Sequence, residues 1–107
     1  RMVLRIYLKS YLRKIMSRIE LNKNNWVLNG NVTFYEIPFL MMQTKNHSWN
    51  ESITLDMSQV KSIDTSLLGL LFEWKRQANQ KKHSFNITNV PYNLIKLAKL
   101  YGVKEFL

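Results

Sequence analysis

The chain has 107 residues, 46% of them hydrophobic, with three Trp, five Tyr and five Phe; this is enough apolar material for one packed domain and argues against wholesale disorder. Cysteine is absent, which excludes disulfides and thiol-ligated zinc or iron–sulfur sites and fits a reducing compartment. The net charge of +9 is concentrated at the start, because Arg1, Arg5, Lys9, Arg13 and Lys14 precede the first acidic residue.

Residues 1–15 are predicted to form a basic amphipathic helix, with cations on one stripe and apolar side chains (Leu4, Leu8, Tyr11, Leu12 and Ile15) on a neighbouring face. Two interpretations are open: a helix that binds a membrane surface or a partner, or an accessory extension ahead of a true start at Met16. No apolar run approaches the roughly 20 residues that span a bilayer, and charges interrupt any signal-peptide core. A cytoplasmic protein is therefore expected.

A β-hairpin is predicted for residues 17–28. Ile19 and Leu21 alternate with polar residues, residues 22–25 supply a turn, and the return strand follows. Gly30, near the end of that strand, indicates a bend or a close approach of the backbone.

A helix is predicted next, and its start has two possible forms. Thr33 and Glu36 have the spacing of a capping box, in which the hydroxyl reaches the N3 amide and the carboxylate reaches back. Pro38 instead favours a helix that begins near Ile37 with the proline at its first position. In both forms the helix runs to Met42 and ends in a polar stretch.

The central prediction is a strand over residues 53–57, a short polar turn, and a helix over residues 65–80. Its apolar stripe is broad enough to indicate burial against a sheet, and it comprises Leu67, Leu68, Leu70, Leu71, Phe72, Trp74 and Ala78. Asp64, Thr65 and Ser66 stand at the helix entrance, where free N–H groups and the positive end of the helix dipole lie. Such a position is typical of a cap, an anion site or a phosphorylation switch.

A last strand is predicted around residues 85–90, and a last helix opens at Pro91 and ends at Gly102. Strands that alternate with helices imply right-handed crossovers and a mostly parallel sheet, and the opening hairpin makes the sheet mixed. The fold class is therefore α/β, in a single domain.

Enzymatic motifs are sparse. His47 and His83 lie in polar stretches and are predicted to be surface residues, the seven acids form no pair suited to general acid–base chemistry, and three glycines cannot build a phosphate-binding loop. We therefore expect no catalytic residue, no metal and no cofactor. The charge outside residues 1–15 is dispersed, which argues against a nucleic-acid binder.

Three segments together resemble a STAS domain: Gly30-x-Val32-Thr33-Phe34, the D-x-S…I-D-T pattern within residues 55–65, and L-A-K-L-Y-G-V at residues 97–103. The resemblance covers residues 16–107, has no counterpart for residues 1–15, and is strongest to the MlaB branch, the cytoplasmic subunits of Mla phospholipid-transport ABC complexes.

The resemblance implies a mixed-sheet STAS fold and a non-enzymatic protein that works by docking. In the MlaB branch, the surface around Thr65 is expected to contact an MlaF-like ATPase and, through it, an MlaE-like permease and an MlaD-like MCE subunit. The complex maintains outer-membrane lipid asymmetry, so the protein is expected at the cytoplasmic face of the inner membrane, with membrane contact indirect or through residues 1–15. The contact candidates are Asp64, Thr65, Ser66, Phe39 and Tyr101; Phe39 also fits the core, and Tyr101 also fits the core edge.

An alternative function comes from the same family. In anti-sigma-factor antagonists, a kinase phosphorylates the hydroxyl residue after the motif Asp, which corresponds to Thr65. Small residues, often Gly-Gly or Ser-Gly, commonly follow that switch, whereas this chain has Ser66 and Leu67, and the bulkier helix start is expected to hinder kinase access. A structural role is also open, since a cap formed by Asp64 or Thr65 would contribute about 1 kcal/mol.

Overall fold

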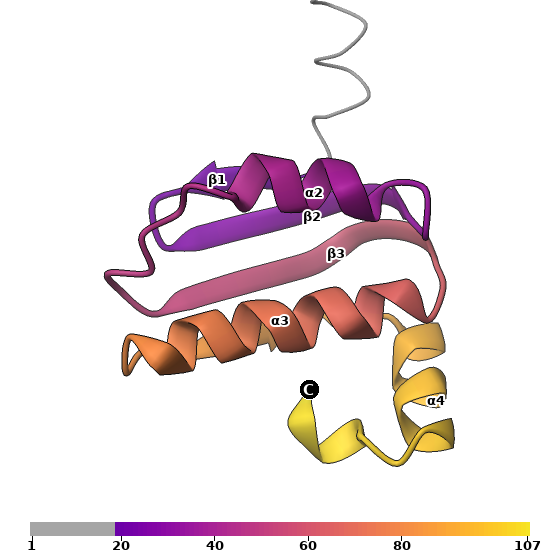
Figure 1. Cartoon of the computed structure of the whole chain (residues 1–107). Coiled ribbons are helices and arrows are strands. Elements are labelled where there is room, and N and C mark those ends of the chain that lie inside the picture. The colour runs from indigo at the N-terminus through magenta and orange to yellow at the C-terminus, as the bar shows by residue number, and fades with distance from the viewer. Residues whose placement is uncertain (1–18) are drawn as a thin grey trace, which may run out of the picture.

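Four strands form one mixed sheet whose order follows the chain, β1-β2-β3-β4 (Figure 1). The computed structural model describes residues 19–107, so the helix predicted for residues 1–15 lies outside the described part. Strand β1 (Ile19–Asn22) pairs antiparallel with β2 (Asn25–Val32), and β3 (Ile53–Ile63) pairs parallel with both β2 and β4 (Phe85–Thr88). The predicted α/β class, the hairpin and the mixed sheet are confirmed.

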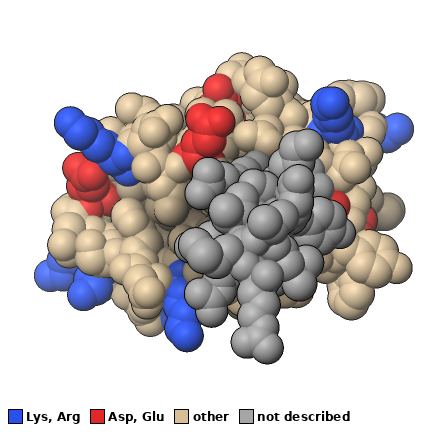
Figure 2. Space-filling model, turned by 90° about the horizontal axis from the view of Figure 1, so that it is seen from above, with Lys and Arg blue, Asp and Glu red and all other residues tan. Residues whose placement is uncertain are grey.

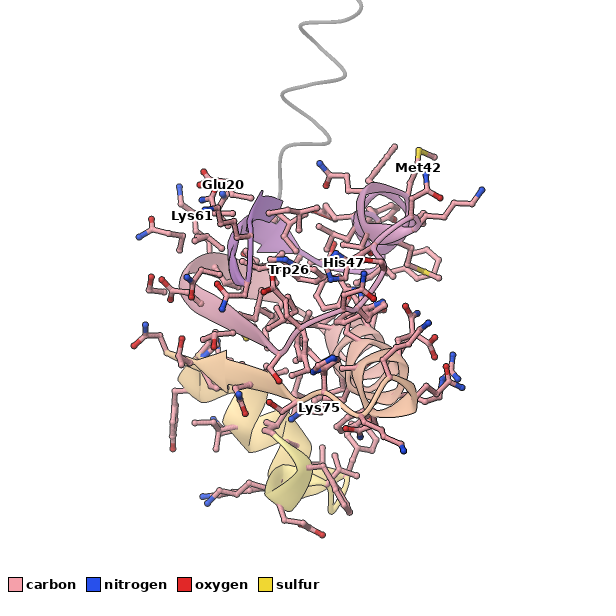
Figure 3. The ribbon with its side chains drawn as sticks, turned by 90° about the vertical axis from the view of Figure 1, so that its left-hand side faces the viewer. Glu20, Trp26, Met42, His47, Lys61 and Lys75 are labelled. Carbon is pink, nitrogen blue, oxygen red and sulfur yellow. The ribbon has the colours of Figure 1, made fainter. Side chains whose placement is uncertain are left out.

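The helices follow the strands as predicted, and they are α2 (Ile37–Thr44), α3 (Ser66–Gln80), α4 (Tyr92–Leu100) and the 3-10 turn η1 (Lys104–Phe106). Helices α2 and α3 cover one face of the sheet, and α4 stands at the end where α3 begins (Figure 1). The side view in Figure 3 shows Glu20 and Lys61 on the opposite, outer side. Because β2 and β3 are parallel, their carboxyl ends meet at the edge from which α2 and α3 start.

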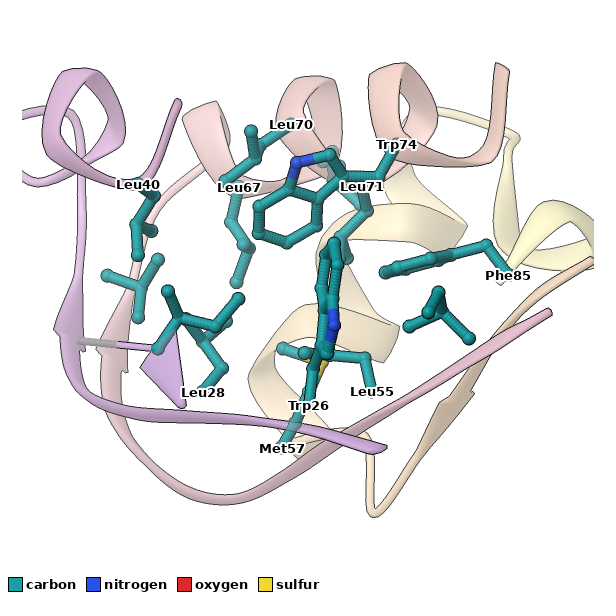
Figure 4. Packing of buried hydrophobic residues seen from close by; sticks show 14 of the residues in the cluster. Trp26, Leu28, Leu40, Leu55, Met57, Leu67, Leu70, Leu71, Trp74 and Phe85 are labelled. Carbon is teal, nitrogen blue, oxygen red and sulfur yellow. The ribbon is translucent and has the colours of Figure 1, made fainter. Parts of the chain in front are cut away.

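The core lies between the sheet and helices α2 and α3, and aromatic rings fill its centre (Figure 4). The indole of Trp26 is fully buried, with ring centroids at 5.5 Å from Trp74, 5.3 Å from Trp49 and 5.8 Å from Phe85. The α3 stripe predicted from helical spacing points into this cluster, where Leu67 and Leu71 are fully buried. Burial of this stripe fixes which side of α3 remains on the surface.

The surface position predicted for His47 holds only in part, because the side chain is half-buried. Its ring packs edge-on against Trp26 at 4.9 Å and against Trp49 at 4.7 Å, and its Nε2 is buried. Burial lowers the pKa of His47, and the nearby Glu51 carboxylate opposes that shift. The polar neighbours of His47 in the sequence concealed its contact with the core, because the segment has no helical or strand period.

Helix α2 starts at Ile37 with Pro38 in its first turn, which confirms the second of the two forms predicted. The capping box is not formed. Residues 33–36 make a turn in which the Glu36 amide donates to the Thr33 carbonyl at 2.9 Å, and the Thr33 hydroxyl donates to Glu36 Oε2 at 2.8 Å. The Thr33 hydroxyl is therefore hydrogen-bonded to the Glu36 carboxylate and not to the backbone of the helix. The helix start is set by Pro38 instead.

Strand β3 is longer than predicted, since it runs to Ile63 and leaves no polar turn after Met57. It pairs with β2 along this length, but the pairing is irregular at two places. Opposite Val27–Asn29 and opposite Gly30–Asn31, β3 has one residue more than β2. Gly30 has φ 81°, which confirms the predicted bend. At the first irregularity, the Ser58 amide donates to Asp56 Oδ1 at 2.9 Å.

Candidate docking site at the start of helix α3

The start of α3 is held by Asp64, which follows the last residue of β3. Its Oδ1 accepts the Ser66 amide at 2.9 Å, and its Oδ2 accepts the Phe34 amide at 2.8 Å. One carboxylate thereby satisfies an amide of the first helical turn and ties the β2–α2 connection to the start of α3. Asp64 is thus the capping group among the alternatives open from the sequence.

The electrostatics of Asp64 follow from these contacts. Partial burial acts to raise the pKa of the carboxyl, but the hydrogen bonds from Phe34 and Ser66 outweigh it, so the pKa lies below its ordinary value. The group is therefore ionised at neutral pH, and a negative charge next to the positive end of the α3 dipole is favourable.

Thr65 occupies the N-cap position of α3, yet its hydroxyl makes no capping hydrogen bond. The side chain is exposed. Because Asp64 performs the capping, the Thr65 hydroxyl remains on the surface at the helix entrance, where it can donate to or accept from another molecule.

A hollow of about 350 Å³ lies beside Thr65, between the first turns of α3 and the segment after α4. Leu68, Gly69 and Phe72 line it from α3, and Tyr101 and Val103 close the other side. Gly69 leaves it open, since a Cβ built there would meet no atom within 4 Å. The structure thus brings Thr65 and Tyr101, which are far apart in the sequence, to one surface hollow.

The geometry of Tyr101 depends on the end of α4. Gly102 has φ 69° and donates to the Lys99 carbonyl at 3.1 Å, and Val103 donates to the Ala98 carbonyl at 2.8 Å, the pair of bonds of a Schellman motif. The chain reverses there, which leaves Tyr101 59% exposed at the rim and returns Val103 to α3. The predicted helix end at Gly102 is confirmed.

Comparison with known proteins identifies this arrangement. The sequence model of the MlaB-type STAS domain matches residues 16–107. The chain belongs to the STAS domain family. Members of this family are generally non-enzymatic.

Other comparisons add only the fold. The crystal structure of a protein named Mglu superposes with a TM-score of 0.55 at 14% sequence identity, over 69% of this chain. The alignment spans 19% of the Mglu chain, so the likeness concerns a small part of that protein. No curated protein matches.

Two exposed aromatic side chains near the α3 start were not predicted from the sequence. Phe34 is 68% exposed and Tyr35 79% exposed, and their rings meet edge-on at 5.6 Å. The bond from the Phe34 amide to Asp64 places them next to the α3 start. The available signal was the aromatic pair itself, just after the predicted return strand. The predicted capping box from Thr33 to Glu36 instead assigned both residues to the first turn of a helix.

The remaining predicted site residues are placed differently. Ser66 is half-buried and contributes its amide to Asp64 rather than an exposed side chain. Phe39 is half-buried on α2 and does not line the hollow beside Thr65. Of the predicted contact residues, Thr65 and Tyr101 line one hollow, and their contact roles stay predictions; the exposed Phe34–Tyr35 pair beside the α3 start is added by the structure.

The described residues offer two further negative findings. Within residues 19–107, no helix has the length and apolar character to cross a bilayer. In the same range, no three His, Cys, Asp or Glu side chains gather closely enough to hold a metal ion.

Proposed function

We propose that this STAS domain is a non-enzymatic subunit that binds the ATPase of an ABC phospholipid transporter through the surface around Thr65. The observation that carries the proposal is the match to the MlaB-type model together with an exposed threonine that its own helix does not use. The partner is an MlaF-like ATPase, with an MlaE-like permease and an MlaD-like MCE subunit attached through it. The subunit supports assembly and activity of a transporter that maintains outer-membrane lipid asymmetry, and it resides at the cytoplasmic face of the inner membrane.

The chemistry of the surface supports docking. Tyr101, Phe34 and Tyr35 are exposed aromatic rings, the class of side chain that most often anchors protein interfaces. Tyr101 lines the apolar hollow beside the Thr65 hydroxyl, so a partner can bury an apolar side chain there and hydrogen-bond to Thr65, and the Phe34 amide is bonded to the neighbouring Asp64. Asp64 bonds to the amides of Phe34 and Ser66 and so fixes the backbone on both sides of Thr65 before a partner binds, which favours binding.

The phosphorylation switch is the competing function. A phosphate on Thr65 would share the helix start with the ionised Asp64 carboxylate, and the Ser66 amide is already bonded to that carboxylate. Both facts reduce what a phosphate would gain at this helix N-terminus. Incubation with a cognate serine/threonine kinase, followed by mass spectrometry at Thr65, separates the two functions.

Co-purification with the transporter ATPase tests the proposal. Thr65→Glu adds a charge at the centre of the surface, and Gly69→Leu fills the hollow with a good helix former; we expect both to reduce co-purified ATPase at least tenfold while the circular dichroism spectrum is unchanged. Ser48→Glu is the matched control, because Ser48 is an exposed hydroxyl residue in the α2–β3 connection. Wild-type yields for both site variants would refute the proposal.

A further inference from the structure

A second hollow continues the first along α3. It has a volume of about 870 Å³ and lies between the later turns of α3 and the residues after α4. Phe72 and Val103 line both hollows, so they form one groove that follows α3 from Thr65 to Gln80. At a rise of about 1.5 Å per residue, a helix of this length is roughly 22 Å long, so the groove can accommodate about four turns of another helix.

The floor of the second hollow is apolar and its α3 rim is cationic and polar. Phe72, Val103 and Leu107 supply the floor, and Phe106, at the mouth, is 57% exposed. Lys75 and Arg76 line the rim, followed by the uncharged Asn79 and Gln80, and Glu105 is the acid among the lining residues.

The two cations are bound differently. Arg76 donates to both carboxylate oxygens of Glu73 on the surface. Lys75, which Figure 3 places between α3 and the C-terminal segment, donates from Nζ to the Phe85 carbonyl at 3.0 Å. Burial lowers the pKa of Lys75. The Lys75 ammonium is half-buried and its hydrogen-bond partner is a neutral carbonyl. A carboxylate from a ligand would therefore stabilise its positive charge.

The charge of the described chain is divided between two parts. Residues 75–107 contain seven bases and one acid, a net charge of +6, whereas residues 19–74 contain three bases and six acids, a net charge of −3. The charged side chains that line the groove, Lys75, Arg76 and Glu105, belong to the positive part, whereas the end of the groove at Thr65 belongs to the other part. By contrast, acidic and basic side chains both appear on the α2 and β1 side in Figure 2. The long-range field therefore favours an anionic ligand at the groove.

We propose that the groove along α3 binds an amphipathic helix of a protein partner, with its apolar side on Phe72 and Val103 and with acidic residues facing Lys75 and Arg76. The proposal rests on the proposed function in one respect: it gives the chemistry of the partner element that would continue from the Thr65 surface along the groove. A helix fits because the two hollows form an elongated, shallow groove with an apolar floor. An anionic bilayer fits less well, since it is flat and would leave the apolar floor unfilled.

Synthetic peptides of four helical turns test the charge and shape requirements on the full-length chain. One peptide carries Leu at i, i+3, i+4 and i+7 with Glu on both flanks, and a second has Lys in place of each Glu. We expect the Glu peptide to bind at least tenfold more tightly by fluorescence anisotropy, with affinity falling as salt rises. In ¹⁵N-resolved NMR spectra, the amide shifts should centre on Phe72 and Val103.

Two variants of equal charge change make the test specific. Asn79→Asp with Gln80→Glu places two carboxylates on the groove rim at nearly constant shape, and should weaken the Glu peptide about tenfold. Asn31→Asp with Gln59→Glu makes the same change at exposed strand positions outside the groove, and should alter binding less than twofold. Equal affinity for the two peptides, equal effects of the two double variants, or tighter binding to vesicles with 30% phosphatidylglycerol would overturn the inference.

Failure of this inference differs from failure of the proposed function. If Thr65→Glu abolishes co-purification of the ATPase and the Asn79→Asp, Gln80→Glu variant retains it in full, the Thr65 surface docks the partner and the groove does not. If neither set of variants affects co-purification although the Glu peptide binds in the groove, the ATPase is not the partner.

Discussion

Replacing Asp64 by Ala removes the carboxylate that joins the start of α3 to the β2–α2 connection. Two hydrogen bonds are lost, at 2.9 Å from the Ser66 amide and at 2.8 Å from the Phe34 amide. Loss of a helix cap is worth about 1 kcal/mol, and loss of a further bond to a carboxylate on the surface is worth about 1 kcal/mol. We therefore expect Asp64→Ala to lower the free energy of unfolding by about 2 kcal/mol.

The effect of Asp64→Ala should depend on pH. The pKa of Asp64 in the folded state lies below its ordinary value of 3.8, so the stabilisation is present above that value and is lost as pH falls through the folded pKa. The wild type should therefore exceed the variant by the full difference at pH 7, and the two should converge as pH falls below 3.8 and through the folded-state pKa.

Urea unfolding followed by tryptophan fluorescence measures the difference, because Trp26, Trp49 and Trp74 are all buried. Thr65→Ala is the matched control: it lies at the same helix start but makes no capping bond, so it should change stability by less than about 0.5 kcal/mol. The reasoning fails if Thr65→Ala destabilises as much as Asp64→Ala, or if the Asp64→Ala difference does not shrink as pH is lowered from 7 to well below 3.8.

Three further substitutions probe the fold. Leu67→Ala empties a fully buried position and should lower the free energy of unfolding by about 3 kcal/mol in urea; a loss below 1 kcal/mol would contradict its place in the core. Lys82→Gly should raise the melting temperature by several degrees, since Lys82 holds φ 61° at the α3 end, and an unchanged or lower value would contradict this. Glu73→Gln should lower the free energy of unfolding in urea by less than about 0.5 kcal/mol near pH 7, since the pair with Arg76 is on the surface and screened by solvent; a loss above 1 kcal/mol would contradict this.

The parts of the fold that local sequence determines were predictable. The apolar stripe of α3 and the glycine that ends α4 each act within a few residues, and both are confirmed. Pro38 likewise indicated the correct start of α2, because its ring fixes a backbone angle without reference to the rest of the chain.

The length of β3 was not predictable from alternation. Each extra residue shifts the side chains that follow to the other face, so the pattern that identifies Ile53, Leu55 and Met57 as inward-facing breaks after Met57. A polar turn was the natural interpretation of that break. The pairing with β2, which maintains the strand to Ile63, involves residues about 30 positions away.

The candidate site shows the same division. The helix entrance at Asp64 and Thr65 was evident from the sequence, but which of the two caps α3 depended on the backbone at Phe34. The proximity of Tyr101 to Thr65 depends on how the segment after α4 returns to α3. Phe34 and Tyr35 were missed for a similar reason, because the contact that positions them spans 30 residues.

The two halves of β3 differ in how many neighbours hold their backbone. Residues 54–56 pair with β2 on one side and β4 on the other, whereas residues beyond Asp56 pair with β2 alone, through a ladder interrupted twice. Amide hydrogens in the second half should therefore exchange with solvent faster, since local opening breaks fewer bonds there. That half leads directly into Asp64 and Thr65, so slower exchange after Met57 would report occupancy of the docking surface without isolation of a complex.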